Sequence, residues 1–162
     1  MFGTKYSINQ WTTGGCPSSK VVMGMPTYGR GFTVSGDSFT PGSPASGASA
    51  PGPYTGDAGF LGYYEICDKV NSGWTPVFDE TLQSMYAYGD GEWVGYENVQ
   101  TFQLRCDFIN AMELGGAMVW DISTDDVTGQ KCGQGEYPLV NTLKTCLNTG
   151  DSNASYDYEN DY

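Results

Sequence analysis

Histidine is absent from the 162-residue sequence, and only 7 residues are lysine or arginine against 19 aspartates and glutamates. The lack of histidine excludes Ser-His and Cys-His catalytic dyads. The net charge of −12 argues against nucleic acid and anionic membrane surfaces as partners, and it suits a neutral or basic ligand. No apolar stretch is long enough to cross a membrane, and no signal peptide is visible.

The sequence also lacks the C-x-x-C spacing of structural zinc sites, although it contains five cysteines. This argues against a zinc site and favours a secreted protein with disulfides. Cys106 and Cys146 lie in consecutive helix-like segments and are candidates to pair. Spacing alone does not fix the connectivity.

Two short apolar segments end in residues suited to ligand contact. Gly115–Asp121 is too short for a helix and is typical of a buried strand, and Trp120 lies at its end. Ligand contacts often lie at the carboxyl ends of parallel strands, and a tryptophan ring offers a flat face to a sugar. A core tryptophan that caps the strand fits this segment equally well. Lys20–Phe32 is a second such strand, and its polar, aromatic and basic end favours the ligand-binding interpretation.

Together these segments resemble the last two barrel strands of glycoside hydrolase family 18, the chitinases and chitinase-like lectins. Gly24–Phe32 matches the G-x-P-x-Y-G-R-x-F pattern of the family's seventh strand, and Gly115–Trp120 matches the G-G-x-M-x-W pattern of its eighth. Residues 52–55 and 61–67 look like the family's insertion domain, and residues 134–139 look like the approach to its last helix. Several motifs in the right order make the resemblance specific.

The resemblance implies an α/β fold, namely the C-terminal portion of a TIM (β/α)8 barrel with strands seven and eight and an α+β insertion domain. Residues 1–30 are expected to hold a helix end and strand seven, 31–96 the insertion domain, and 97–147 a helix, strand eight and the last helix. Residues 148–162 form an acidic tail that is expected to be disordered. A complete barrel usually needs roughly 250 residues, so the rest of the barrel is expected upstream.

Hydrophobic periodicity and turn residues predict the local elements. The loop 35–56 has the Gly/Pro/Ser composition of a flexible linker, but Phe39 and Tyr54 favour an ordered loop. Asn98 is expected to cap a helix, and Leu61, Tyr64 and Cys67 are expected to share one face of another. Strands are predicted at 21–26, around 32, and at 75–78, 84–88, 93–96 and 115–120; helices are predicted at 60–70, 98–113 and 139–147, with a helix end at 6–11.

The resemblance also implies a sugar-binding site. Trp120 would form the floor under the reacting sugar, and Tyr28 and Arg30 would bond sugar hydroxyls and a neighbouring carboxylate. Arg30 is equally suited to bracing the insertion domain. Asp57 and Phe60 fall where the family places an acidic and an apolar contact from the insertion wall. The implied ligand is chitin or chito-oligosaccharide, with no cofactor.

The family's proton donor is missing from the sequence. Catalysis in this family rests on a D-x-x-D-x-D-x-E motif, which does not occur here, and Asp121–Asp126 has the wrong spacing. No catalytic residue is therefore expected in this chain. Three hypotheses remain open: part of a secreted, extracellular chitinase, a chitin-binding lectin of the same fold, or an acidic matrix protein. Asp121, Ser123 and Asp125 resemble the start of a calcium loop, but the required Gly and Glu are absent, so no metal site is expected.

Two further features complete the expectations. The resemblance implies a disulfide between Cys67 of the insertion domain and Cys132 after strand eight. If Cys106 and Cys146 also pair, Cys16 has no partner within this sequence. Asn153 begins an N-x-S sequon and is a candidate glycosylation site in the tail.

Overall fold

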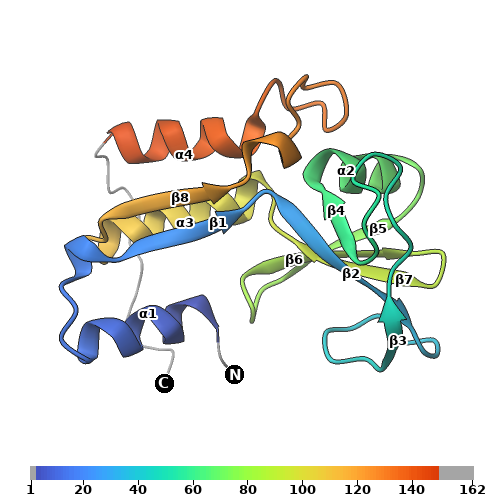
Figure 1. The fold of residues 1–162 in the computed structure, drawn as a ribbon, viewed down its shortest axis with the longest axis horizontal. Helices are drawn as coiled ribbons and strands as arrows, with labels where there is room; N and C mark the ends of the chain where they lie inside the picture. The colour runs from blue at the N-terminus through green and yellow to red at the C-terminus, as the bar shows by residue number, and fades with distance from the viewer. Residues whose placement is uncertain (1–2, 150–162) are drawn as a thin grey trace.

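The computed structural model describes residues 3–149, and its elements form two groups (Figure 1). One group is a pair of strands with three helices, and the other is a six-stranded sheet with one helix. The last helix, α4 (Pro138–Thr149), includes the first two residues of the predicted acidic tail, so the expected disorder is wrong for residues 148–149. Residues 150–162, with the sequon at Asn153, lie outside the described residues.

The first group is built on two parallel strands. β1 (Val22–Pro26) and β8 (Gly116–Trp120) pair in register from Val22↔Gly116 to Pro26↔Trp120. The strand periodicity turns Met23 and Met25 into the core, while Val22 and Met118 are exposed. In Figure 1 the helix α3 lies behind this pair and no helix lies in front of it.

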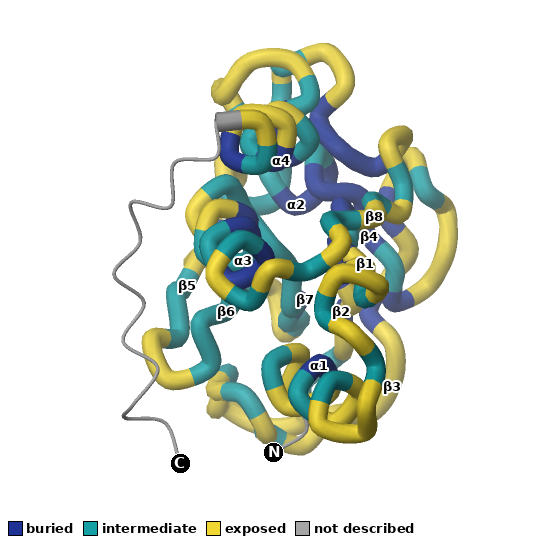
Figure 2. Tube along the Cα trace, turned by 90° about the vertical axis from the view of Figure 1, so that its left-hand side faces the viewer, coloured by how far each residue is buried: buried dark blue, intermediate teal, exposed yellow. Residues whose placement is uncertain are grey.

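Three helices and two short 3-10 turns belong to the same group as the strand pair. They are α1 (Thr4–Thr13), α3 (Val99–Ala111), α4 (Pro138–Thr149), η1 (Ser18–Lys20) and η2 (Ile122–Thr124). Buried residues are visible on α3 and beside α2 in Figure 2. The shared core consists of Ile8, Met23, Met25, Tyr63, Phe102, Cys106, Phe108, Ile109, Leu139, Leu143 and Cys146.

The predicted helix after Asn98 is confirmed, and so is its cap. The Asn98 Oδ1 accepts the Thr101 N–H at 2.9 Å, and the Thr101 hydroxyl oxygen accepts the Asn98 N–H at 2.8 Å. The side chains of Phe102, Cys106 and Ile109 are buried as the helical spacing predicts. The strands predicted at 21–26 and 115–120 and the helix predicted at 139–147 are also present.

The second group is an antiparallel sheet with the strand order β3-β2-β7-β6-β5, and β4 also pairs with β2. Helix α2 (Tyr63–Asn71) packs on it around a small core of Leu61, Ile66, Trp74, Ala87 and Val94. The strands are β2 (Tyr28–Val34), β3 (Ala45–Ala48), β4 (Phe60–Gly62), β5 (Thr75–Asp79), β6 (Ser84–Gly89) and β7 (Glu92–Tyr96). The three strands predicted between residues 75 and 96 are thus confirmed.

The helix predicted from Phe60 begins three residues later. Residues 60–62 form β4, because they pair with Tyr28–Arg30 of β2, and α2 starts at Tyr63. The prediction that Leu61 shares one helix face with Tyr64 and Cys67 is therefore wrong. Leu61 is a strand residue, and the buried residues of the helix are Tyr63, Glu65 and Ile66.

The loop 35–56 is ordered, as its aromatic residues predict. The Phe39 ring stacks on the Tyr88 ring at 4.8 Å between centroids, and β3 pairs with the edge of β2 inside this loop. The linker interpretation of this segment is wrong, because these contacts attach the loop to the sheet.

The packing of α2 on β2 depends on Gly29. A Cβ there would lie 2.6 Å from Val94 Cγ2 and 2.7 Å from Ile66 Cδ1, so a side chain forces the sheet and helix apart. We expect Gly29→Ala to lower the free energy of unfolding by about 1–3 kcal/mol, measured by urea denaturation. Gly47→Ala is the matched control, because no heavy atom lies within 4 Å of that position. Equal stability of the two variants would contradict this packing.

Candidate functional site

The predicted site residues come from three places in the fold. Trp120 is the last residue of β8, and Tyr28 and Arg30 lie on β2. Asp57 lies in the turn before β4, and Phe60 is the first residue of β4. β1 and β2 are separated only by Thr27, so the strand pair and the sheet meet at this point.

Trp120 combines a fixed backbone with a free ring. Its carbonyl accepts the Thr27 N–H at 3.2 Å, and the peptide bond to Asp121 is cis. The buried Thr27 hydroxyl bonds the Asp121 carbonyl and lies 2.7 Å from the Thr124 hydroxyl. The Trp120 side chain nevertheless remains 63% exposed. Trp120 lies on the same face of β8 as the exposed Met118, two residues before it. The choice between a ligand contact and a core position in a complete domain therefore stays a prediction.

Tyr28, Phe60 and Arg30 form one cluster. The rings of Tyr28 and Phe60 are 4.7 Å apart between centroids, and the Arg30 guanidinium carbon lies 5.2 Å and 5.0 Å from them. The cause is the pairing of β2 with β4, which places Arg30 opposite Phe60. A cation over an aromatic ring is stabilising. This packing agrees with a role for Arg30 in bracing the insertion domain. The predicted contact of Arg30 with a sugar stays a prediction.

Asp57 is exposed in the turn before β4, where its carbonyl accepts the Phe60 N–H at 3.2 Å. The fold therefore brings Tyr28, Arg30 and Phe60 into contact, and Asp57 lies in the turn three residues before Phe60.

Tyr54, which is exposed, and Tyr64, which is half-buried, were not predicted as site residues from the sequence. Tyr64 packs edge-on against Tyr54 at 5.7 Å, and Lys131 Nζ lies 5.4 Å from the Tyr54 ring centroid. Burial raises the pKa of Tyr64, and the charges of Glu65, Tyr54 and Asp121 add to the rise. Tyr54 is 63% exposed. The sequence signal that could have identified it as a contact residue is a large aromatic residue in a Gly/Pro-rich loop.

Buried acids shape the loop that follows Trp120. The Asp125 carboxylate accepts the N–H groups of Val140 and Leu139 at 3.0 and 3.1 Å, and burial raises its pKa. The Asp126 carboxylate accepts the N–H groups of Lys131 and Cys132 at 2.9 and 2.8 Å. Both carboxylates thus organise the main chain. Within the described part of the chain no group of three or more potential metal ligands occurs.

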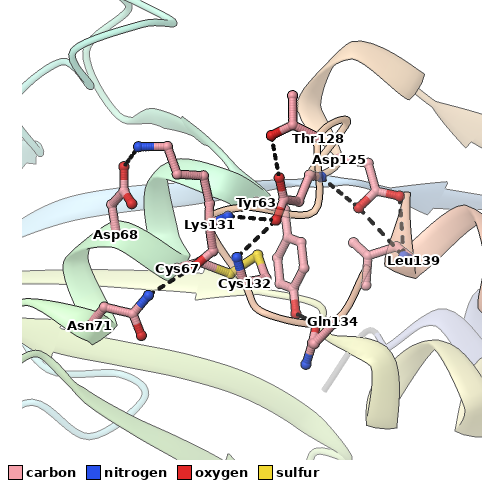
Figure 3. The surroundings of a disulfide bond; sticks show 11 residues. Tyr63, Cys67, Asp68, Asn71, Asp125, Thr128, Lys131, Cys132, Gln134 and Leu139 are labelled. Carbon is pink, nitrogen blue, oxygen red and sulfur yellow. Dashed lines mark hydrogen bonds and ion pairs between the residues drawn. A yellow bond between two sulfur atoms is a disulfide. The ribbon is translucent and has the colours of Figure 1, made fainter. Parts of the chain in front are cut away.

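Two disulfides connect the elements. Cys67 of α2 is joined to Cys132 of the loop after β8, with 5.1 Å between their Cα atoms (Figure 3). Beside it, Lys131 Nζ pairs with Asp68 at 2.8 Å, and the Tyr63 hydroxyl donates to Gln134 at 2.9 Å. The second disulfide joins α3 to α4 through Cys106 and Cys146, and Cys16 is free.

The sequence profile of the glycosyl hydrolases family 18 matches residues 1–125. The chain belongs to this family. Human chitinase-3-like protein 2 is 43% identical over 146 residues, which cover 90% of this chain and 37% of that protein. Mouse chitotriosidase-1 is 42% identical over 143 residues, which cover 88% of this chain and 30% of that protein. The chain therefore spans about a third of the length of these relatives.

Solved structures of family members superpose on the chain. Human YKL-39, described as a pseudo-chitinase with retained chitooligosaccharide binding, matches 89% of this chain and 39% of its own with a TM-score of 0.85 and 44% identity. A group IV chitinase of Ostrinia furnacalis in complex with allosamidin matches 91% of this chain and 40% of its own, with a TM-score of 0.87 and 40% identity. The family is a TIM-barrel family, and the mixed α/β content of this chain agrees with it.

Human YKL-39 was also solved in the presence of the chitooligosaccharide GlcNAc4. The relatives and neighbours are chitinases and chitinase-like proteins, and this chain itself contains two disulfides. None of the helices in residues 3–149 has the length and apolar character needed to span a membrane.

Proposed function

We propose that the chain is the C-terminal part of a secreted chitinase-type domain that binds chitin and its oligomers. In this proposal β1 and β8 are strands seven and eight of the barrel, and the six-stranded sheet with α2 is the insertion domain. The parallel pairing of β1 with β8 supports this, and so does the exposed apolar face of Val22 and Met118, on which the rest of a barrel would pack. The disulfides agree with an extracellular location.

The observation that carries the sugar site is the exposed side chain of Trp120, whose backbone is hydrogen-bonded at the carboxyl end of a parallel strand. An indole face covers the apolar face of a pyranose, and such stacking adds on the order of 1 kcal/mol to area burial. The cluster of Tyr28, Arg30 and Phe60, with Asp57 beside it, would then form the wall of the cleft. The ligand is uncharged, which agrees with a surface that has few cations.

In the complete domain the sugar's own N-acetyl carbonyl would attack the anomeric carbon, one of the exceptions to the two-carboxylate scheme. A glutamate from the D-x-x-D-x-D-x-E motif would protonate the leaving oxygen, and that motif does not occur in this chain. The residues described above would stack, orient and distort the sugar. Catalysis is thus assigned to residues outside the present sequence.

A chitin-binding lectin of the same fold is the second candidate function. The 43% identity to chitinase-3-like protein 2 and the superposition on a pseudo-chitinase favour it. Both candidates use the same sugar site, and the presence or absence of the glutamate upstream separates them. The acidic matrix protein is the third candidate, and only the net charge of −12 supports it.

The chain alone is expected not to hydrolyse chitin oligomers, because it lacks the proton donor. General acid assistance is worth roughly 100- to 10,000-fold in rate, and a poor leaving group needs it. The measurement is release of a chromophore from a chitobioside by the purified 162-residue chain. Turnover that is abolished by a point substitution in this chain would contradict the proposal.

Binding tests the sugar site itself. We define the complete domain as this chain joined to the N-terminal barrel part, taken from its own gene or from a family-18 relative. Calorimetric titration with chitohexaose should show binding, and cellohexaose, which lacks the N-acetyl groups, should bind more weakly. A complete domain that folds but binds neither oligomer would overturn the proposed function.

A further inference from the structure

Glu65 is a buried carboxylate in the first turn of α2, with 1% of its surface exposed. Its Oε1 accepts the N–H groups of Tyr54 and Thr55 at 2.8 and 3.0 Å. Its Oε2 accepts the Gly62 N–H at 2.8 Å and lies 2.9 Å from the Thr55 hydroxyl. All four donors belong to the segment 54–62, which we call the rim segment.

Such an arrangement is more than a helix cap. A cap needs one contact to the start of its own helix, and here the Gly62 N–H supplies it. The other three donors lie ten and eleven residues before Glu65, so the carboxylate fastens a distant part of the chain. Burial raises the pKa of Glu65, but the hydrogen bonds from Thr55, Tyr54 and Gly62 outweigh it and lower the pKa below its ordinary value. The group is therefore charged at neutral pH, and its bonds are of the stronger, charge-assisted kind.

The chain just before the rim segment packs closely against Glu65. A Cβ at Gly52 would lie 2.3 Å from Glu65 Oε1, so the chain before Tyr54 passes directly against the carboxylate. The Thr55 hydroxyl also lies 3.1 Å from the Phe60 carbonyl, which connects the carboxylate to β4. Phe60 in turn contacts Tyr28 and Arg30. A continuous set of short contacts thus runs from Glu65 to the wall of the sugar site.

The rim segment carries Phe60 of that wall and two exposed residues. Phe60, half-buried, lies near its end, the exposed Asp57 lies in its middle, and Tyr54, 63% exposed, lies at its start with its ring edge-on to Tyr64. Because the Tyr54 N–H is held by Glu65, this large ring is presented to solvent from a fixed backbone. A fixed, exposed ring is suited to stack on a sugar at little entropic cost.

We propose that Glu65 is a positioning residue of the sugar site, which holds the rim segment so that Phe60 and Tyr54 both contact the bound oligosaccharide. The inference rests on the proposed function. It adds Tyr54 as a sugar contact and Glu65 as the residue that holds the rim segment in place.

The test uses Glu65→Gln in the complete domain with chitohexaose. Glutamine keeps the size but removes the charge and turns an NH2 group toward main-chain donors, so the rim segment loosens. We expect affinity to fall about three- to tenfold, since hydrogen bonds to charged groups are among the stronger ones. Hydrogen exchange at the Tyr54 and Thr55 amides should accelerate about tenfold or more. Glu97→Gln is the matched control, because Glu97 pairs with Arg105 away from the rim segment.

A double-mutant comparison separates positioning from general destabilisation. If Glu65 acts through the rim, Glu65→Gln should change affinity less than about twofold in a background that carries Tyr54→Ala and Phe60→Ala. In a Trp120→Ala background it should retain its full effect. The same loss of affinity in both backgrounds would show that Glu65 has no positioning role, while the sugar site would stand.

If Glu65→Gln does not fold, Thr55→Val provides the second variant. It removes only the hydroxyl between Glu65 and the Phe60 carbonyl, and the same pattern of non-additivity with Phe60→Ala is expected. A complete domain that fails to bind chitohexaose at all would instead refute the proposed function together with this inference.

Discussion

Trp120→Ala in the complete domain is expected to weaken chito-oligosaccharide binding by about tenfold or more. The substitution removes an indole that is held at its backbone and exposed on its ring, so both the area burial and the stacking contribution are lost. Because Thr27, Asp121 and Thr124 hold the neighbouring main chain through their own contacts, the loop is expected to keep its structure.

Arg30→Ala is the comparison for this experiment. The Arg30 guanidinium packs on the rings of Tyr28 and Phe60, so its removal is expected to affect the wall more than the sugar. We therefore expect a smaller loss of affinity than for Trp120→Ala. Titration of chitohexaose by calorimetry provides both values. Equal affinities of Trp120→Ala and the unmodified domain would refute the assignment of Trp120 as the sugar platform.

The elements that sequence reasoning located are those with a local cause. The apolar runs that end in Pro26 and Trp120 identify β1 and β8, and Asn98 with Thr101 marks the start of α3. These signals lie within a few residues of the elements they predict. The two parallel strands were therefore placed almost to the residue.

The elements that were missed depend on partners far away in the chain. Phe60-Leu61 is as apolar as the first turn of a helix, and only its pairing with β2 makes it a strand. The strand Ala45–Ala48 has no hydrophobic pattern and four exposed residues, and it exists because the edge of β2 accepts it. Neither pairing can be inferred from residues within one turn or one hairpin.

The candidate site divides in the same way. Trp120, Tyr28 and Arg30 came from motifs that end strands, whereas Glu65 was seen only as part of a helix. An acid in a first helical turn is explained locally by the helix dipole, so nothing in the sequence showed that this one reaches Tyr54 and Thr55. Residues that act by holding others are found from hydrogen bonds in three dimensions.

Cys67→Ala is expected to lower the free energy of unfolding of the 162-residue chain by about 2–5 kcal/mol, the usual cost of losing a native disulfide. Cys67 and Cys132 are 65 residues apart in sequence, and their bond joins the helix of the six-stranded sheet to the loop after β8. Without it, the polar contacts at this junction include the ion pair of Lys131 with Asp68, the Tyr63–Gln134 hydrogen bond, and the hydrogen bond that Asn71 Nδ2 donates to the Lys131 carbonyl at 2.8 Å. The ion pair is partly exposed, and such pairs contribute little.

The loss should be local as well as large. Hydrogen exchange is expected to accelerate in α2 and in the loop 121–137, and to change little in α3 and α4, which the Cys106–Cys146 disulfide joins. Cys16→Ala is the control, since Cys16 is a free cysteine and its replacement removes no cross-link. Urea denaturation provides the free energies, and peptide mapping without reductant checks the pairing. If mapping found the thiols of both Cys67 and Cys132 free in the unmodified chain, the junction would have to be held by packing alone.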